Sequence, residues 1–306
     1  MNRAILRVAA GLAGVVLTVA SAAGHPGSGI VVTAAGVVYF VDNSPPPPEG
    51  TGREIVWKVE KNGKLTACSS GGGHWLAMDE GGNFRRVDFG KWFRERLAPN
   101  FGRVMPADFG PGLIVGDGQP FVMGRDGNLY FARGNLELMR LTREGKVTAV
   151  MPGMLGEADR RGGIKGLASG PDGSIYLAYP RAVQKITTDG HASIVADGIE
   201  IDGCTKPEVD PAMPGPYLRG LAVTARGIVY AAATNCRRVI RISPDGKVTT
   251  VLASEPWIPT AVAVAGEDVY VLEFSDARAT QWRPRVRKVA ADGKAVVVAE
   301  VPERAE

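Results

Sequence analysis

The sequence predicts an all-β fold made of repeated units, and three observations lead to this prediction. Short runs of β-branched and aromatic residues recur along the chain, separated by turns that contain Gly. The segment 218–252 shows one unit in full, with four such runs at 220–224, 228–233, 239–242 and 247–252. The first turn of each unit carries a Gly, and these residues recur 39 to 54 positions apart, a spacing typical of a repeat with loop insertions: Gly36, Gly82, Gly127, Gly173, Gly227 and Gly266.

The turns indicate how the runs pair. Asp-Gly between alternating apolar runs, as at Asp245-Gly246, is a strong hairpin signal. We expect type I′ turns there, because such turns need positive φ and Gly adopts it without steric cost. Four short antiparallel strands in about 35 residues form one propeller blade, and a single blade cannot bury its own faces. Six units therefore predict a six-bladed β-propeller with four antiparallel strands per blade.

The repeats assign residues 24–306 to a single β-propeller domain. The blades are expected at approximately 28–68, 74–106, 117–153, 164–199, 217–254 and 257–301. The second blade is the least regular: we expect its inner hairpin at 74–89 and its outer half at 93–104. Because the first and last blades each look complete, we expect the ring to close by packing of the last blade on the first, without an exchanged strand.

The N-terminus is typical of a signal peptide at residues 1–23. Arg3 and Arg7 precede an apolar run at 8–19, and Ala20-Ser21-Ala22 offers a small-residue cleavage site. The alternative is an uncleaved membrane anchor, for which the apolar run is short. No later run is apolar enough to span a bilayer. The mature chain is thus expected to be periplasmic or secreted, with no integral membrane span.

Charge and cysteine content narrow the partners. The chain carries 36 basic and 32 acidic residues, and loss of Arg3 and Arg7 would leave 34 against 32, a net charge of +2. Nucleic-acid binding favours concentrated basic patches, which a net charge of +2 does not indicate. No nucleic-acid partner is therefore expected. Cys204 and Cys236 flank the inner hairpin of the fifth blade, and an oxidising compartment permits a disulfide between them. The alternative is that these two and Cys68 are buried small apolar residues.

The long connections should gather at one end of the propeller. They lie between second and third strands at 42–54 and 273–284, and between blades at 103–118, 152–163 and 197–217. In an up-and-down blade both classes leave from the same end. Binding residues often lie on loops held by a rigid scaffold, so this end is the predicted functional face. Neutral loop drift is the alternative, because surface insertions cost little.

Residues at the strand ends should surround the channel mouth at this face. Those directly before the innermost strands are His74, Gln119, Lys165, Arg219 and Thr260. Those directly after the second strands are Asp42, Arg133, Tyr179, Asn235 and Glu273. Converging polar groups in a concave site predict ligand binding, and the proposed contacts are His74, Gln119, Arg133, Lys165, Tyr179, Arg219, Asn235 and Glu273. Hydrated channel lining is the alternative for each of them.

The pattern GxxxDGxxYxA followed by RxxxxxxDGKVTxV resembles the NHL-repeat and SMP-30/gluconolactonase-like six-bladed propellers. The segment QPFVMGRDGNLYFA at 119–132 also resembles streptogramin lyase, a propeller with one more blade. The gluconolactonase resemblance implies a divalent cation held by a Glu in the first blade and by an Asn and an Asp, each before a GLA strand. Here Lys165 and Arg219 precede the two GLA strands, and their charges would repel a cation. The family's metal site is therefore not expected, nor any other cofactor.

A different metal site is an alternative, formed by Asp42, His74 and Glu273 from neighbouring blades. His74 could also act as a general base without a metal, in a hydrolase or lyase of the kinds that the resemblance implies. The favoured hypothesis is a monomeric binding module. Lys165, Arg219 and Arg133 make the mouth positive, which suits a small anionic ligand or an acidic peptide or protein partner. Nearby aromatic residues could anchor such a partner: Tyr217, Trp257, Phe274 and Trp282.

Overall fold

The computed structural model describes residues 27–43, 55–70, 73–84, 102–104, 112–116, 118–134, 136–151, 162–204, 209, 215–275 and 283–302. The predicted signal peptide and most of the predicted strands at 84–89 and 93–104 lie outside these ranges. In the part of the chain that is described, no helix is long and apolar enough to cross a membrane.

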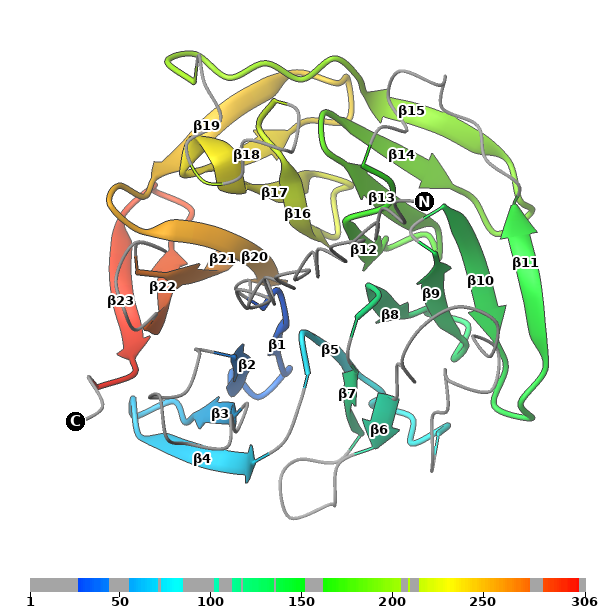
Figure 1. The fold of residues 1–306 in the computed structure, drawn as a ribbon, viewed down its shortest axis with the longest axis horizontal. Coiled ribbons are helices and arrows are strands. Elements are labelled where there is room, and N and C mark those ends of the chain that lie inside the picture. Colours follow the sequence, from blue (N-terminus) through cyan, green and yellow to red (C-terminus); the bar gives the residue numbers. More distant parts are fainter. Residues whose placement is uncertain are drawn as a thin grey trace, which may run out of the picture.

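The chain forms a β-propeller whose antiparallel sheets stand around a central axis (Figure 1). Five described sheets have four strands contiguous in sequence, as predicted. The first contains β1 (Ile30–Val32), β2 (Val38–Asp42), β3 (Ile55–Val59) and β4 (Leu65–Ser70). The next of these contains β8 (Phe121–Met123), β9 (Leu129–Arg133), β10 (Glu137–Leu141) and β11 (Val147–Met151).

Three further four-stranded sheets follow along the chain. One contains β12 (Gly166–Ser169), β13 (Ile175–Tyr179), β14 (Ala182–Ile186) and β15 (Ala192–Ala196). The next contains β16 (Leu218–Val223), β17 (Val229–Ala233), β18 (Arg238–Ile242) and β19 (Val248–Ala253). The last contains β20 (Ile258–Ala265), β21 (Asp268–Phe274), β22 (Pro284–Val289) and β23 (Ala295–Glu300).

The sheet between the first and third units departs from the prediction. It has three described strands in the order β5 (Trp75–Met78), β7 (Leu113–Gly116), β6 (Gly102–Val104). The partner of β5 is thus β7, which comes from a segment expected to be an inter-blade loop, and the expected inner hairpin at 74–89 is wrong. The reason is burial: Leu113, Ile114 and Val115 are fully buried, whereas the competing sequence FRRVDF contains three charged residues.

The hairpin turns use Gly as expected, but the turn type differs. Gly36 and Gly246 have φ of 78° and 84°, and Tyr217 and Arg237 are the non-Gly residues with positive φ in the described ranges. At Ser243–Lys247 the amide of Gly246 donates to the carbonyl of Ser243 at 2.8 Å, and the amide of Ser243 donates to Lys247 at 3.0 Å. This is a type I turn followed by one left-handed Gly, so the predicted type I′ turn is wrong. The three-residue loop needs positive φ at one position only.

A cross-strand pair recurs in each four-stranded blade. A Tyr of the second strand lies directly opposite a Lys or Arg of the third. The pairs are Tyr39–Lys58, Tyr130–Arg140, Tyr176–Lys185, Tyr230–Arg241 and Tyr270–Lys288. Such aromatic–cation pairs stabilise adjacent strands, which explains the Tyr of the sequence repeat. Burial, with a hydrogen bond to Asp126, raises the pKa of Tyr130 to about 12.

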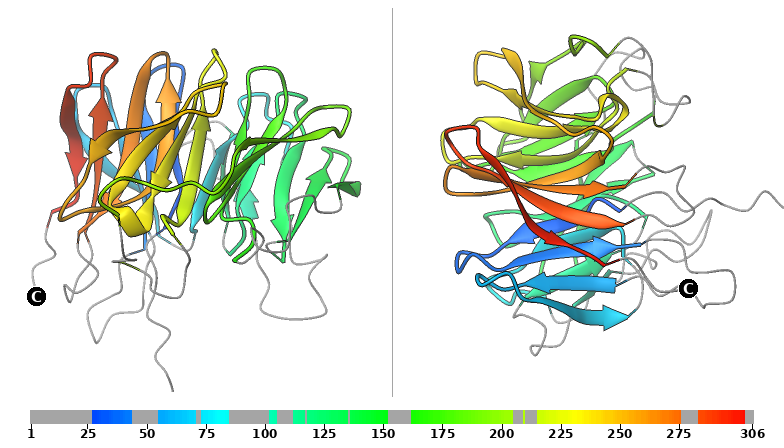
Figure 2. Two further views of the ribbon diagram at one scale, coloured as in Figure 1. Left: turned by 90° about the horizontal axis from the view of Figure 1, so that it is seen from above. Right: turned by 90° about the vertical axis from the view of Figure 1, so that its left-hand side faces the viewer.

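The ring closes as predicted, without an exchanged strand. One hydrophobic cluster joins the first and last blades, with Val41 and Val56 on one side and Leu272 and Val286 on the other. The short hairpin turns lie at one end of the propeller, and the described ends of the long connections lie at the other (Figure 2). We call this second end the loop-rich end. It is the end at which every inner strand begins.

Candidate functional site

The inner strands of all six sheets line one central channel. Equivalent five-residue segments start at the loop-rich end of each sheet: 28–32, 74–78, 119–123, 165–169, 219–223 and 260–264. The last three residues of every segment line a cavity of about 240 Å³. All of these lining residues are apolar except Ser169. The side chains along the channel are therefore mostly apolar. The first residue of each segment lies at the loop-rich end, and among these six residues Ser28 lines the cavity itself.

Glycine sets the alignment of neighbouring inner strands. A Cβ atom on Gly166 would stand 1.8 Å from the carbonyl oxygen of Arg219, and one on Gly220 would stand 2.4 Å from the Cα atom of Ala261. The backbones of adjacent blades thus touch directly behind the rim. This contact holds Lys165, Arg219 and Thr260, the residues just before these positions, at one level of the channel.

We define the rim by its six residues, one from each sheet: Ser28, His74, Gln119, Lys165, Arg219 and Thr260. Five of them are the residues predicted to precede the innermost strands. Ser28 was missed, although it stands two positions before Ile30 just as Lys165 stands two before Leu167. None of the six is acidic, and all of them can donate a hydrogen bond when His74 carries a proton on the appropriate nitrogen. The rim is suited to acceptors.

Two rim hydroxyls are buried without a partner. Ser28 is 4% exposed and Thr260 is 0% exposed, and the Oγ atom of each has no hydrogen bond among the described residues. A buried polar group without a partner costs roughly 1–3 kcal/mol. Both hydroxyls belong to the adjoining first and last blades. Ser28 also lines the channel cavity, so its hydroxyl is placed to hydrogen-bond a group bound there.

The ring of Tyr217 contacts both cationic side chains of the rim, Lys165 and Arg219. The Nζ atom of Lys165 and the Cζ atom of Arg219 each lie 5.8 Å from the centroid of its ring, which is cation–π distance. Tyr217 has φ of 52°, an unfavourable conformation for a bulky residue, and its carbonyl accepts the amide of Thr234 at 3.1 Å. The sequence indicated Tyr217 only as a loop aromatic. Its strained backbone brings one ring against side chains from two neighbouring blades.

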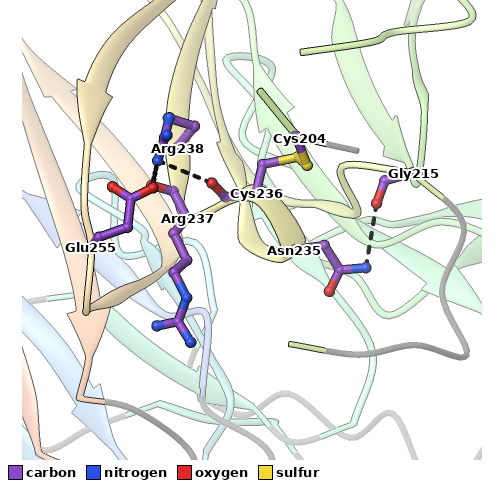
Figure 3. The surroundings of a disulfide bond; sticks show 7 residues. All are labelled: Cys204, Gly215, Asn235, Cys236, Arg237, Arg238 and Glu255. Carbon is purple, nitrogen blue, oxygen red and sulfur yellow. Dashed lines mark hydrogen bonds and ion pairs between the residues drawn. A yellow bond between two sulfur atoms is a disulfide. The ribbon is translucent and has the colours of Figure 1, made fainter. Parts of the chain in front are cut away.

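A disulfide lies next to Asn235, which binds the backbone before Tyr217; Figure 3 shows the disulfide with Asn235 and Gly215. Cys204 is bonded to Cys236 with the Cα atoms 5.3 Å apart, and Cys236 ends the 3-10 helix η3 (Thr234–Cys236). Next to it, the amide of Asn235 donates to Pro216 at 3.0 Å, and its side chain donates to Gly215 at 3.3 Å. Asn235 is 0% exposed. Asn235 thus holds the backbone that precedes Tyr217, and its predicted role as a ligand contact stays a prediction.

The third cysteine has no part in this linkage. Cys68 is a buried free thiol at the end of the first blade, and burial raises its pKa above the ordinary value. A protonated, buried thiol is a poor nucleophile. Cys68 therefore acts as a small apolar core residue, which was the alternative considered for all three cysteines.

The residues that follow the second strands contact their own blades. The Nε atom of Arg133 donates to Glu137 at 2.6 Å, and the hydroxyl of Tyr179 donates to Gln184 at 3.3 Å. Asp42 accepts the indole N–H of Trp57 at 3.1 Å. In each case the partner is on the third strand, because the end of the second strand lies beside the start of the third. Their roles as ligand contacts stay predictions.

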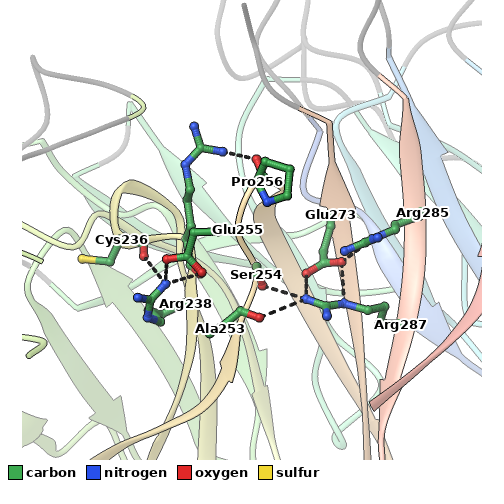
Figure 4. Close-up of polar contacts among 10 residues, drawn as sticks. Cys236, Arg238, Ala253, Ser254, Glu255, Pro256, Glu273, Arg285 and Arg287 are labelled. Carbon is green, nitrogen blue, oxygen red and sulfur yellow. Dashed lines mark hydrogen bonds and ion pairs between the residues drawn. The ribbon is translucent and has the colours of Figure 1, made fainter. Parts of the chain in front are cut away.

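Glu273 is the centre of a buried ion cluster (Figure 4). It is 0% exposed and accepts Nε and Nη2 of Arg287 at 2.8 and 2.5 Å, and Nε of Arg285 at 2.7 Å. Arg287 also donates to the hydroxyl of Ser254 at 3.1 Å, and Arg285 stacks 3.9 Å from the ring centroid of Trp257. The carboxylate is saturated by charge-assisted bonds. Its described contacts join strands of the last blade.

The alternative metal site was predicted at Asp42, His74 and Glu273. No group of three His, Cys, Asp or Glu within the described ranges could hold a metal ion. Glu273 accepts hydrogen bonds from Arg285 and Arg287, and Asp42 accepts one from Trp57. Two of the aromatic residues proposed to anchor a partner have structural contacts: Phe274 is fully buried, and Trp257 stacks on Arg285. Trp282 lies outside the described residues.

Comparison with known proteins supports the fold. No family model matches the chain, and no curated protein matches it. Among solved structures, virginiamycin B lyase from Staphylococcus aureus has a TM-score of 0.52 at 14% identity, covering 91% of this chain and 85% of that one. A putative gluconolactonase has a TM-score of 0.52 at 15% identity, covering 90% of each chain.

A third similar structure is an auxiliary nutrient binding protein from Bacteroides thetaiotaomicron. Its TM-score is 0.50 at 11% identity, covering 86% of this chain and 70% of that one. These three proteins combine one architecture with different functions, as propellers do. At such identities the likeness concerns the architecture alone. The chain is similar to the lyase, gluconolactonase and binding-protein β-propellers in fold.

Proposed function

We propose that this protein is an exported six-bladed propeller that binds a small anionic ligand at the rim of its central channel. The observation that carries the proposal is the composition of the rim. It combines Lys165 and Arg219 with the hydroxyls of Ser28 and Thr260, which have no partner among the described residues, and it contains no carboxylate. The three-stranded sheet β5–β7–β6 is taken as the sixth blade, because β5 lines the channel with the other inner strands.

The chemistry of the rim favours a carboxylate or a similar oxyanion. Lys165 and Arg219 come from neighbouring blades and contact one ring, so their charges act on the same small volume. Hydrogen bonds between charged groups are roughly twice as strong as neutral ones. The buried hydroxyls of Ser28 and Thr260, on the first and last blades, are further neutral donors at the same end of the channel. An oxyanion can accept hydrogen bonds from donors of both kinds, whereas a cation is repelled by Lys165 and Arg219.

Export is supported by two features of the chain. Residues 1–23 have the order of a signal peptide, and Cys204 and Cys236 form a disulfide, which persists in oxidising compartments. A periplasmic or extracellular ligand follows from this placement. A hydrolase or lyase is the second candidate, because His74 lies on the same rim as the anion-binding groups. In that case His74→Asn abolishes turnover and leaves anion binding in place.

The experiment is a binding titration with simple anions. Acetate, benzoate, citrate and phosphate are titrated calorimetrically into the wild type and into the Lys165→Ala/Arg219→Ala variant. We expect the strongest-binding anion to lose about 2 kcal/mol, or roughly 30-fold in Kd, as the charge-assisted bonds are removed. Lys146→Ala/Lys247→Ala is the matched control, because it removes the same charge from exposed turns at the opposite end. Equal affinity in the rim variant and the control contradicts the proposal.

A further inference from the structure

Below the rim, the side chains on the last three positions of the described inner strands are apolar, with the exception of Ser169. Behind the polar first residues come Leu167 and Phe121, then the small side chains of Ala168 and Ala222, then Met123 and its equivalents on the other inner strands. This order of polar rim and apolar wall repeats on all six inner strands. A ligand that fills such a site has a polar end and an apolar body.

We propose that the ligand is an amphipathic carboxylate whose acid group lies on the rim and whose apolar chain enters the channel. The proposal rests on the anion site proposed above and names the class of ligand that this site takes. Apolar groups in an apolar channel displace water that can form few hydrogen bonds with the wall. The carboxylate keeps its hydrogen bonds at the rim, so that neither end of the molecule is left unsatisfied.

The dimensions of the channel fit one ring or a chain of medium length. Its volume of about 240 Å³ exceeds that of the apolar cavity, about 150 Å³, that is known to hold benzene in another protein. The rim and the last lining residues are four positions apart on each strand, a depth of roughly 13 Å at about 3.3 Å per residue. The extended chain of octanoate is shorter than this depth.

One polar side chain interrupts the wall at its far end. Ser169 lines the cavity, and its Oγ atom is buried without a hydrogen-bond partner among the described residues. Replacement of Ser169 by Leu removes this unpaired hydroxyl and narrows the channel, while the rim is unchanged. Met123→Trp narrows the channel from a neighbouring blade and serves as the second variant. Ser193→Leu is the matched control, because Ser193 is exposed on the outer strand β15 of the same blade.

Three probes separate the contributions of the two ends. Octanoate carries acid group and chain, acetate carries the acid group alone, and 1-octanol carries the chain without the charge. Each buried methylene is worth roughly fourfold in affinity, so acetate should bind at least 100-fold more weakly than octanoate. 1-Octanol should bind at least tenfold more weakly, because it lacks the charge-assisted bonds. Calorimetry on the wild type gives these ratios.

The variants then show where the alkyl chain of octanoate lies. We expect Ser169→Leu and Met123→Trp to weaken octanoate at least tenfold and to leave acetate unchanged, and Ser193→Leu to change neither. If acetate binds as tightly as octanoate and both need Lys165 and Arg219, the anion site stands and the amphipathic ligand is refuted. If 1-octanol equals octanoate and the rim variant binds both normally, the channel binds apolar molecules, and both the anion site and this proposal are refuted.

Discussion

Glu273 illustrates how a charged side chain becomes structural when the adjacent strand supplies its counter-ions. Its carboxylate is fully buried between Arg285 and Arg287, whose side chains are 13% and 15% exposed. Removal of one partner from such a cluster leaves uncompensated charge in the interior, which costs about 3–5 kcal/mol. The pair of Arg133 and Glu137 occupies the same place on another blade with both side chains at least 40% exposed.

This contrast gives a prediction at the residue scale. Glu273→Leu should lower the free energy of unfolding by about 3 kcal/mol, because two arginines lose their buried acceptor. Glu137→Leu is the matched control and should cost less than about 1 kcal/mol, since its ion pair is exposed. Urea denaturation followed by tryptophan fluorescence measures both. Similar losses in the two variants would show that the burial of the Glu273 cluster carries no stability.

The positions of five of the six rim residues could be predicted from the sequence, and the partners of the second-strand residues could not. Lys165 and Arg219 precede recognisable GLA strands, so their level in the channel follows from the repeat. Arg133 and Glu273 also stand at predictable strand ends. Their contacts depend on which side chain the third strand places opposite them, which the repeat leaves open. Tyr217 was missed as a contact of the rim cations because its positive φ has no sequence signal.

At the scale of elements, blade five is held at the loop-rich end by a disulfide and by hydrogen bonds of η3. The disulfide, η3 and the amide of Asn235 hold the segment 215–217 against β17 and β18. Its core includes Ile199 and Ile201 from the preceding connection. Because Tyr217 ends this segment, the position of the ring against Lys165 and Arg219 depends on the same linkage.

Removal of the disulfide therefore tests blade five. The cysteines are 32 positions apart, and a loop of this length is worth roughly 3–4 kcal/mol in the chain-entropy account. We expect Cys204→Ser/Cys236→Ser to lose about 3 kcal/mol in unfolding free energy and to bind the anionic probe more weakly. Dithiothreitol should destabilise the wild type and Cys68→Ser, and should have no effect on the double variant. Unfolding of the double variant at the wild-type midpoint would contradict this role.

The strands of five blades could be predicted because each alternates around a Gly turn. In the sheet of β5, β7 and β6, the partner of β5 was predicted wrongly. The actual partner, β7, is only four residues long and follows a long connection. A run as short as LIVG does not by itself distinguish a buried strand from a buried loop segment, although Gly110-Pro111-Gly112 directly before it is a turn signal. The type I turns were also missed, since Asp-Gly is compatible with both hairpin classes.

At the scale of the whole molecule, the propeller converts one local repeat into a ring of equivalent positions. Six inner strands bring six first residues to one rim and three further layers to one apolar wall. The repeat period predicted this architecture, because a single blade cannot bury both of its faces. The sequence also predicted a positive mouth. It gave no sign that the hydroxyls of Ser28 and Thr260 would be buried there without partners, since burial arises only when the ring closes.

The most direct test of the central claim is anomalous diffraction from crystals soaked in bromide. Bromide is a small anion that accepts hydrogen bonds, and it can be located without knowledge of the natural ligand. We predict a bromide site at the rim, within hydrogen-bond distance of the Ser28 or Thr260 hydroxyl and close to Lys165 and Arg219, and no such site in the Lys165→Ala/Arg219→Ala variant. Bromide bound at exposed surface cations, with none at the rim of the wild type, would contradict the claim that the rim is an anion site.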